Sequence, residues 1–264
     1  MGSTALLVQK SYFPDTGRFP LVESSQVSDL FFEKGQTTEL LMVAEGGAVG
    51  RLTVTPRRHS LRLTEAGLGD AAGEIFFAGR LDPGALPMAA ALGEIVWNGS
   101  LFLNRGLGSE GLRIQLRMPK VDLMGQIVFE GKPSRLSYQF KQGAKVLVDS
   151  KDEEKLRALS GELALVGKMT GLPVPGLDAI RDLPKLLEGF APQLTCRHGQ
   201  FAILGRRYDG YVVNLRWSAD VQANFLITEL GELLRIEGIP NLDIIAESFV
   251  PDKLIELEQG VNKP

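Results

Sequence analysis

The sequence predicts a mainly β protein: a curved antiparallel sheet forming an open barrel, half barrel or sandwich, with a few short helices. Three observations support this prediction. Apolar and polar residues alternate with a period of two in about a dozen segments, which is the pattern of half-buried strands. No strand–helix–strand rhythm separates these segments. Gly (30 residues) and Pro (14 residues) are more frequent than in an average globular chain, which indicates many turns.

Neighbouring alternating segments predict strand pairs joined by short turns. Leu52 and Val54 alternate with polar residues, and Pro56 to His59 is expected to form the hairpin turn that follows. Further strands are expected over 112–118, over 136–140 paired with 145–148, and over 211–217 paired with 221–228.

Helical signals are fewer. Ser150-Lys151-Asp152-Glu153 is a capping box, in which Ser150 and Glu153 satisfy each other's free N–H groups at the start of a helix. Short helices are expected over 21–33, 151–159, 177–189 and 252–259. We expect a single β-rich domain over 1–264, with a soft boundary at 170–176, where Gly and Pro cluster.

Composition excludes several classes of protein. The chain of 264 residues is 44% hydrophobic and 23% charged, as in a globular protein with a sizeable core. A net charge of −3 gives no electrostatic case for nucleic-acid binding. The single cysteine, Cys196, excludes an intrachain disulfide. No apolar run is long enough for a transmembrane helix, so we expect no integral membrane segment, and the N-terminus does not read as a signal peptide.

A short repeat is the most informative feature of the chain. Gly is followed by Glu or Gln, a large apolar residue, three variable residues and a second Gly. The third and fifth positions are large and apolar, so each copy predicts a short strand with one apolar face, bounded by glycines where the chain bends. The strict copies are Gly73–Gly79, Gly93–Gly99, Gly125–Gly131, Gly161–Gly167 and Gly199–Gly205, and a looser copy is Gly231–Gly238.

Glycine-bounded amphipathic strands recurring over about residues 46–250 resemble segments of the AsmA and TamB-like bacterial envelope proteins. They are similar in outline to the half-barrel lipoprotein carriers of the LolA type. In those proteins a curved, incompletely closed sheet forms a hydrophobic groove for lipid. The resemblance implies a non-enzymatic protein of the periplasm or cell envelope that binds or shields lipid or another apolar ligand, together with envelope protein partners. No functional residue of those families is carried over to this chain.

The repeat itself supplies the candidate ligand-binding residues, which are the large apolar side chains of four strict copies. If this apolar face is instead fully packed, the chain is a structural, assembly or protein-interaction module. The candidate residues are Ile75, Phe77, Ile95, Trp97, Ile127, Phe129, Phe201 and Ile203.

Catalysis is not expected, and neither is a cofactor or a metal. Gly106 to Gly111 matches the GxGxxG pattern of dinucleotide loops, but a strand pattern follows it, so a glycine-rich hairpin turn is the better interpretation. Cys196 and His198 would share one face of a strand, which leaves an enzyme using these two residues as the least favoured alternative. Arg197 would point to the other face.

Overall fold

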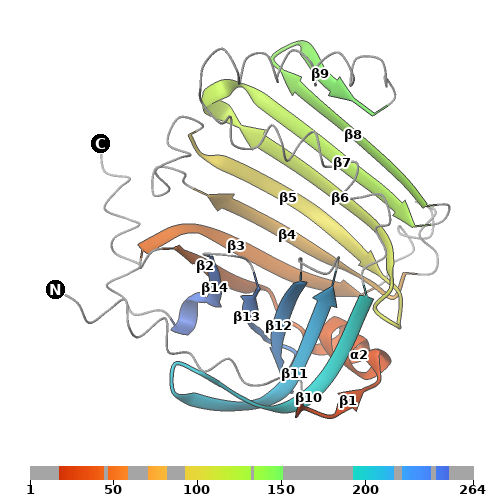
Figure 1. The fold of residues 1–264 in the computed structure, drawn as a ribbon, viewed down its shortest axis with the longest axis vertical. Helices are drawn as coiled ribbons and strands as arrows, with labels where there is room; N and C mark the ends of the chain where they lie inside the picture. Colours follow the sequence, from red (N-terminus) through yellow and green to blue (C-terminus); the bar gives the residue numbers. More distant parts are fainter. Residues whose placement is uncertain are drawn as a thin grey trace.

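A computed structural model of the chain describes residues 18–44, 47–58, 71–81, 93–131, 134–150, 193–216, 222–238 and 242–249. All fourteen strands of this part of the chain join one antiparallel sheet (Figure 1). The predicted mainly β class is therefore confirmed. The sheet is open, because its two ends, β1 and β9, are edge strands that do not pair with each other among the described residues.

Within the described residues, the strands follow one another along the chain, with one α-helix near the start. The elements are β1 (Leu21–Val22), α2 (Ser24–Lys34), β2 (Thr38–Ala44), β3 (Gly47–Arg58), β4 (Gly73–Leu81), β5 (Ile95–Leu103), β6 (Ser109–Met118), the 3-10 turn η3 (Pro119–Val121), β7 (Leu123–Gly131), β8 (Ser134–Gln142), β9 (Lys145–Asp149), β10 (Gln193–Ile203), β11 (Arg206–Arg216), β12 (Gln222–Thr228), β13 (Leu233–Glu237), β14 (Asp243–Ala246) and η4 (Glu247–Phe249).

Two runs of sequential strands build the sheet. Strands β2 to β9 pair in chain order, and so do β10 to β14. The two runs are joined by the pairing of β14 with β2, in a register that sets Ile244 opposite Met42. This pairing brings the last strand of the chain next to the second and makes the two runs one continuous surface.

The sheet is curled at its β10–β3 part. Strands β10 and β3 lie six places apart in the strand order, which corresponds to about 29 Å in a flat sheet. Helix α2, which is about 16 Å long, nevertheless packs on both strands. The sheet must therefore bend around the helix, as Figure 1 shows at its lower end, while β4 to β9 extend away from the curl.

Helix α2 fills the inside of the curl with one apolar face. Val27 and Phe31 are four residues apart, so they lie on the same side of the helix, and Phe32 adds a second ring. All three are buried in one cluster with strand residues from both runs, including Met42 and Cys196. The curled part of the sheet therefore encloses a packed core.

Several predicted elements fall on these observed ones. The helix expected over 21–33 is α2, although Leu21 and Val22 form the short strand β1 against β10. The strand pair expected at 136–148 is β8 with β9, and the pair expected at 211–228 is β11 with β12. The boundary at 170–176, the repeat copy at 161–167 and the helices at 151–159, 177–189 and 252–259 lie outside the described residues.

The hairpin turn expected at Pro56–His59 is wrong, because β3 continues through Pro56 to Arg58 and pairs with β4 along its length. Proline donates no backbone hydrogen bond and is tolerated where no neighbouring strand requires one. The register of β2 with β3 begins at Thr38 and Val54, so Pro56 lies beyond the end of β2. Its missing N–H leaves no gap in the β2–β3 hydrogen bonds.

The first part of the glycine-rich segment, Gly106 to Gly108, lies in the hairpin turn between β5 and β6, as expected, whereas Ser109 to Gly111 already belong to β6. Asn104 closes this turn: its N–H donates to the Gly108 carbonyl at 2.9 Å, and its Oδ1 accepts from the Gly108 N–H at 2.8 Å. The chain then enters β6 and not a helix, so the structural context of a dinucleotide loop is lacking here.

Candidate functional site

Strands β4 to β8, called the arm from here on, carry one continuous apolar face. Residues opposite each other in an antiparallel pair point to the same side of the sheet. Ile75 lies opposite Leu101, and Trp97 lies opposite Leu116. The apolar face of the arm consists of Ile75, Phe77, Leu81, Ile95, Trp97, Leu101, Leu112, Ile114, Leu116, Ile127, Phe129, Tyr138 and Phe140.

Aromatic rings on this face lie over glycines of the neighbouring strand. A Cβ atom added to Gly99 would lie 2.5 Å from Phe77 Cζ, and one added to Gly125 would lie 2.6 Å from Phe140 Cε1. Trp97 covers Gly79 in the same way, with Cε2 at 2.6 Å from the added atom. Glycine leaves room for a ring to lie against the backbone of the neighbouring strand, so aromatic rings cover the sheet at these three positions.

Burial varies across the apolar face. Phe129 and Phe140 are buried, at 6% and 5% exposed, in two small clusters with their neighbours. Ile75, Phe77, Ile95, Trp97 and Ile127 are only half-buried. These five keep apolar area accessible to a ligand, whereas the core side chains inside the curl do not.

Six of the eight predicted site residues come together on this face: Ile75, Phe77, Ile95, Trp97, Ile127 and Phe129. Phe201 and Ile203 do not join them. Cys196 belongs to the cluster that continues from the apolar face of the arm, and Phe201 lies five positions further along β10, on the opposite side. Phe201 and Ile203 are buried in a second cluster with Leu41 and Leu226.

The sequence pattern differs between strands with one apolar face and strands that are apolar on both faces. Strand β6 alternates strictly between apolar and polar residues, as a strand with one wet face does. Strand β2 carries a continuous apolar run, Leu40 to Ala44, and all five residues are buried. Such a run marks a strand that is apolar on both faces. Strand β10 lies in the same part of the sheet but carries no such run, so its own sequence does not show that Phe201 and Ile203 face the other side.

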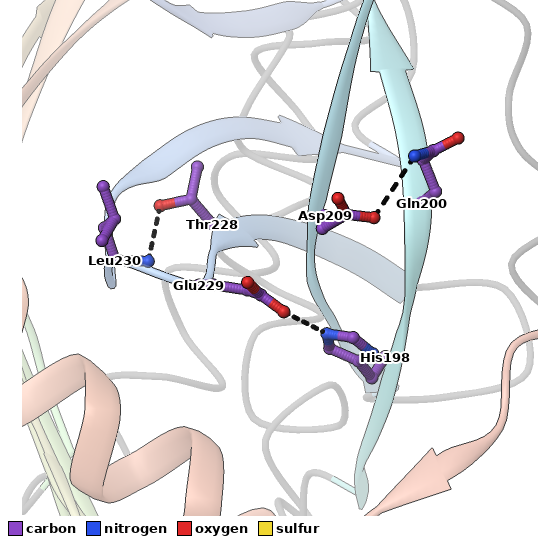
Figure 2. Close-up of polar contacts among 6 residues, drawn as sticks. All are labelled: His198, Gln200, Asp209, Thr228, Glu229 and Leu230. Atoms are coloured by element: carbon purple, nitrogen blue, oxygen red, sulfur yellow. Dashed lines mark hydrogen bonds and ion pairs between the residues drawn. The ribbon is translucent and has the colours of Figure 1, made fainter.

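Cys196 and His198 lie on the same face of β10, as predicted, and Arg197 points away and donates from Nη1 to the Phe19 carbonyl at 2.6 Å. His198 Nε2 lies 3.0 Å from Glu229 Oε1 (Figure 2), and its ring stands 4.9 Å from that of Tyr211. Cys196 is 2% exposed, and burial raises the pKa of its thiol. A buried neutral thiol is a poor nucleophile.

The contacts of His198 hold neighbouring backbone segments together at one end of the sheet. Its backbone N–H donates to Pro20, and its ring holds Glu229 in the turn between β12 and β13. That turn is closed by Thr228 Oγ1, which accepts from the Leu230 N–H at 3.2 Å (Figure 2). The imidazole and carboxylate together are able to move a proton, but the hydrogen bonds of His198 within the described residues bring no nucleophile to them.

A buried ionic cluster lies on the opposite side of the sheet from α2. Arg235 donates from Nε and Nη2 to the two carboxylate oxygens of Asp243, at 2.8 and 2.9 Å. Its Nη1 lies 3.2 Å from Glu237 Oε1. Burial raises the pKa of Glu237, with Arg235 opposing this shift and Asp243 adding to it. The contact of Arg235 with Asp243 ties β13 to β14.

Comparisons with protein-family models, with curated proteins and with solved structures found no match to this chain. No group of three or more His, Cys, Asp or Glu side chains in the described residues is arranged to hold a metal ion. Among the same residues, no helix combines the length and apolar character needed to cross a membrane. The assignment of function therefore depends on the geometry of the arm.

Proposed function

We propose that this protein binds a lipid, or another ligand with a long apolar chain, on the apolar face of the arm. The observation that carries the proposal is the half-buried state of Ile75, Phe77, Ile95, Trp97 and Ile127 on a face that continues over five strands. Apolar area left accessible in a continuous patch marks a binding surface.

The dimensions of the arm suit an acyl chain. Five strands span about 19 Å between the first and the last. One lipid tail extends over about half of the 30 Å hydrocarbon core of a bilayer, that is about 15 Å. A tail lying across the strands would contact the rings of Phe77 and Trp97, which lie over Gly99 and Gly79. The proposed function is non-enzymatic. It is consistent with a location in the bacterial envelope, which the resemblance implies.

The curled part of the sheet is not proposed as the binding surface. Its interior is occupied by Phe31 and Phe32 of α2 and by buried residues of both strand runs. This packing favours a second role for the curled part, as a rigid module that binds other proteins in an assembly. The two roles differ in whether the purified protein carries lipid.

Native mass spectrometry of the gently purified chain tests the proposal. Ile114 lies in the middle of the apolar face, between Gly99 and Ile127, and its neighbour Gln115 faces the other side. The Ile114→Glu variant places a charge where the tail would lie, and a carboxylate there must be desolvated by the ligand. We expect adducts of lipid mass on the wild type and on the matched control Gln115→Glu, and none on Ile114→Glu.

Thermal unfolding of the same samples separates lost binding from lost structure. A folded Ile114→Glu variant that keeps its adducts, or a wild type that carries none and takes up no added fatty acid, contradicts the proposal and favours the assembly role.

A further inference from the structure

The polar face of the arm carries a row of alternating basic and apolar side chains. Each member lies directly opposite the next on the neighbouring strand, so the row crosses six strands at right angles. From β4 to β9 it consists of Arg80, Val96, Arg117, Met124, Lys141 and Val146. This set is called the basic row below.

The basic row is accessible. Arg80 and Arg117 are exposed, and Lys141 is partly exposed. Met124 and Val146 are 46% and 41% exposed, which places them among the most exposed large apolar side chains of the described residues. Met124 lies between the cations Arg117 and Lys141, and Val146 lies beside Lys141 at the edge of the sheet, so the exposed surface interleaves cations with apolar side chains.

Charges around the row keep it basic. The next row towards the middle of the strands carries Asn98, Gln115, Gln126 and Gln139 in β5 to β8, and it ends in β9 on Asp149, whose carboxylate accepts from Gln139 Nε2 at 2.7 Å. At the strand ends, Lys120 and Lys145 add two exposed cations, against the exposed acids Glu94 and Asp122. Among the described residues near the row, the cations outnumber the acids, although the chain as a whole has a net charge of −3; the cations are Arg80, Arg117, Lys120, Lys141 and Lys145, and the acids are Glu94, Asp122 and Asp149.

We propose that the basic row docks the protein on an anionic lipid surface. Neighbouring strands lie about 4.8 Å apart, so the cations recur about every 10 Å along a straight line. Such a line meets the phosphate and carboxylate groups of a headgroup layer, while Met124 and Val146 reach between the headgroups. Basic residues interleaved with apolar ones are the chemistry of a surface that lies on a membrane without crossing it.

A nucleic acid fits the row less well. Its single strands are bound through aromatic side chains on which bases stack, and the members of the basic row other than the cations are Val96, Met124 and Val146. Aliphatic side chains of this kind can insert between the headgroups of a lipid surface.

Docking through the basic row would bring the Trp97 end of the apolar face close to the membrane, although that face lies on the other side of the sheet. Arg117 follows Leu116, which lies opposite Trp97 on the apolar side, and Lys141 follows Phe140. The basic row and the Trp97 end of the apolar face therefore share one set of strand ends. The docking proposal does not depend on the apolar face binding a ligand, since it concerns the opposite side of the sheet.

Vesicle flotation tests the proposal with the full chain. Vesicles of phosphatidylcholine alone are compared with vesicles that also contain phosphatidylserine, at about 0.1 M salt, where surface charges act over about 10 Å. We expect binding to the anionic vesicles only. The double variant Arg117→Ser, Lys141→Ser should bind about 30-fold more weakly, since each basic residue near an anionic surface contributes about fivefold.

Two controls make the result specific. Arg58→Ser with Arg105→Ser removes the same charge near α2, where these residues pair with Glu33 and Asp29, and should keep nearly full binding. The charge-conserving variant Arg117→Lys, Lys141→Arg should also bind, because it keeps both positive charges, and thermal unfolding of the serine variant shows whether that variant is folded. Ile114→Glu, which addresses the apolar face, should still float with anionic vesicles.

The proposal is overturned by any of three outcomes: no binding of the wild type to anionic vesicles, equal loss in the Arg58/Arg105 control, or tighter binding to single-stranded DNA than to the vesicles. The last outcome would assign the row to nucleic acid instead.

Discussion

Replacing Gly125 by alanine tests whether the aromatic rings need the glycines beneath them. The added Cβ would lie 2.6 Å from Phe140 Cε1 and 2.8 Å from Cδ1, and no backbone atom is among its nearest neighbours. Real Cβ atoms do not approach a ring so closely, so the buried Phe140 side chain must move. Overpacking of this kind costs about 1–3 kcal/mol, and we expect the free energy of unfolding to fall by about 2 kcal/mol.

A double-mutant cycle identifies the cause. Phe140→Leu alone removes buried volume and should destabilise the protein by about 1–2 kcal/mol. If the clash with the ring is the reason for the cost of Gly125→Ala, adding this alanine to Phe140→Leu should cost no more than about 0.5 kcal/mol, because the two changes are coupled. Gly47→Ala is the matched control, since the nearest atom to its added Cβ is the Ala44 carbonyl oxygen at 3.9 Å.

Urea unfolding followed by far-ultraviolet circular dichroism measures all four free energies. Additive effects of Gly125→Ala and Phe140→Leu, or a cost of Gly125→Ala no larger than that of Gly47→Ala, would show that the ring does not depend on the glycine.

Three further predictions concern the curled part of the sheet. Burial raises the pKa of Glu237 above its ordinary value of 4.5, so the folded chain holds this proton more tightly than the unfolded chain and loses stability as the pH rises above 4.5. The Glu237→Gln variant cannot ionise, so urea titrations from about pH 4 to 7 should show its stability rising relative to the wild type. A stability difference that stays constant with pH would refute this. Arg235→Met leaves the carboxylates of Glu237 and Asp243 without their cation and should destabilise the protein by about 3–5 kcal/mol. The exposed control Arg206→Met should change the stability negligibly. Equal changes in the two variants would contradict the role of the ionic cluster. Cys196, at 2% exposed and with its pKa raised by burial, should react with iodoacetamide only in denaturant, and rapid labelling of the folded chain would contradict its place in the core.

The arm was the part of the fold most open to prediction from sequence. Each of its strands has one solvent-facing side, so apolar and polar residues alternate from Leu112 to Met118 just as the side chains alternate between the two faces of the sheet. The glycine-bounded repeat also places Ile75, Phe77, Trp97 and Phe129 correctly on a single face, because residues two apart in a strand share a side.

The curl could not be predicted in the same way. The pairing of β14 with β2 joins residues about two hundred positions apart, and no local pattern specifies such a register. Strands buried on both faces, such as β2, also lose their alternation. The repeat copy at Gly199–Gly205 keeps its alternation, with Phe201 and Ile203 buried and Gln200 exposed, but alternation does not specify which side of the sheet the apolar residues face. In that copy Gly205, at φ 82°, forms the turn between β10 and β11, and Phe201 faces away from the α2 side.

The fluorescence of Trp97 tests the lipid-binding surface most directly. The chain has two tryptophans, so the Trp217→Phe variant leaves Trp97 as the single reporter. Trp97 is half-buried on the apolar face, with its ring over Gly79. Fatty acids carrying bromine along the tail quench an indole only on contact. If the tail lies on the apolar face, brominated fatty acid will quench Trp97 saturably, unbrominated fatty acid will compete, and the same variant carrying Ile114→Glu will not respond. Fatty acid that binds the protein while leaving the Trp97 emission unchanged would contradict the proposed surface.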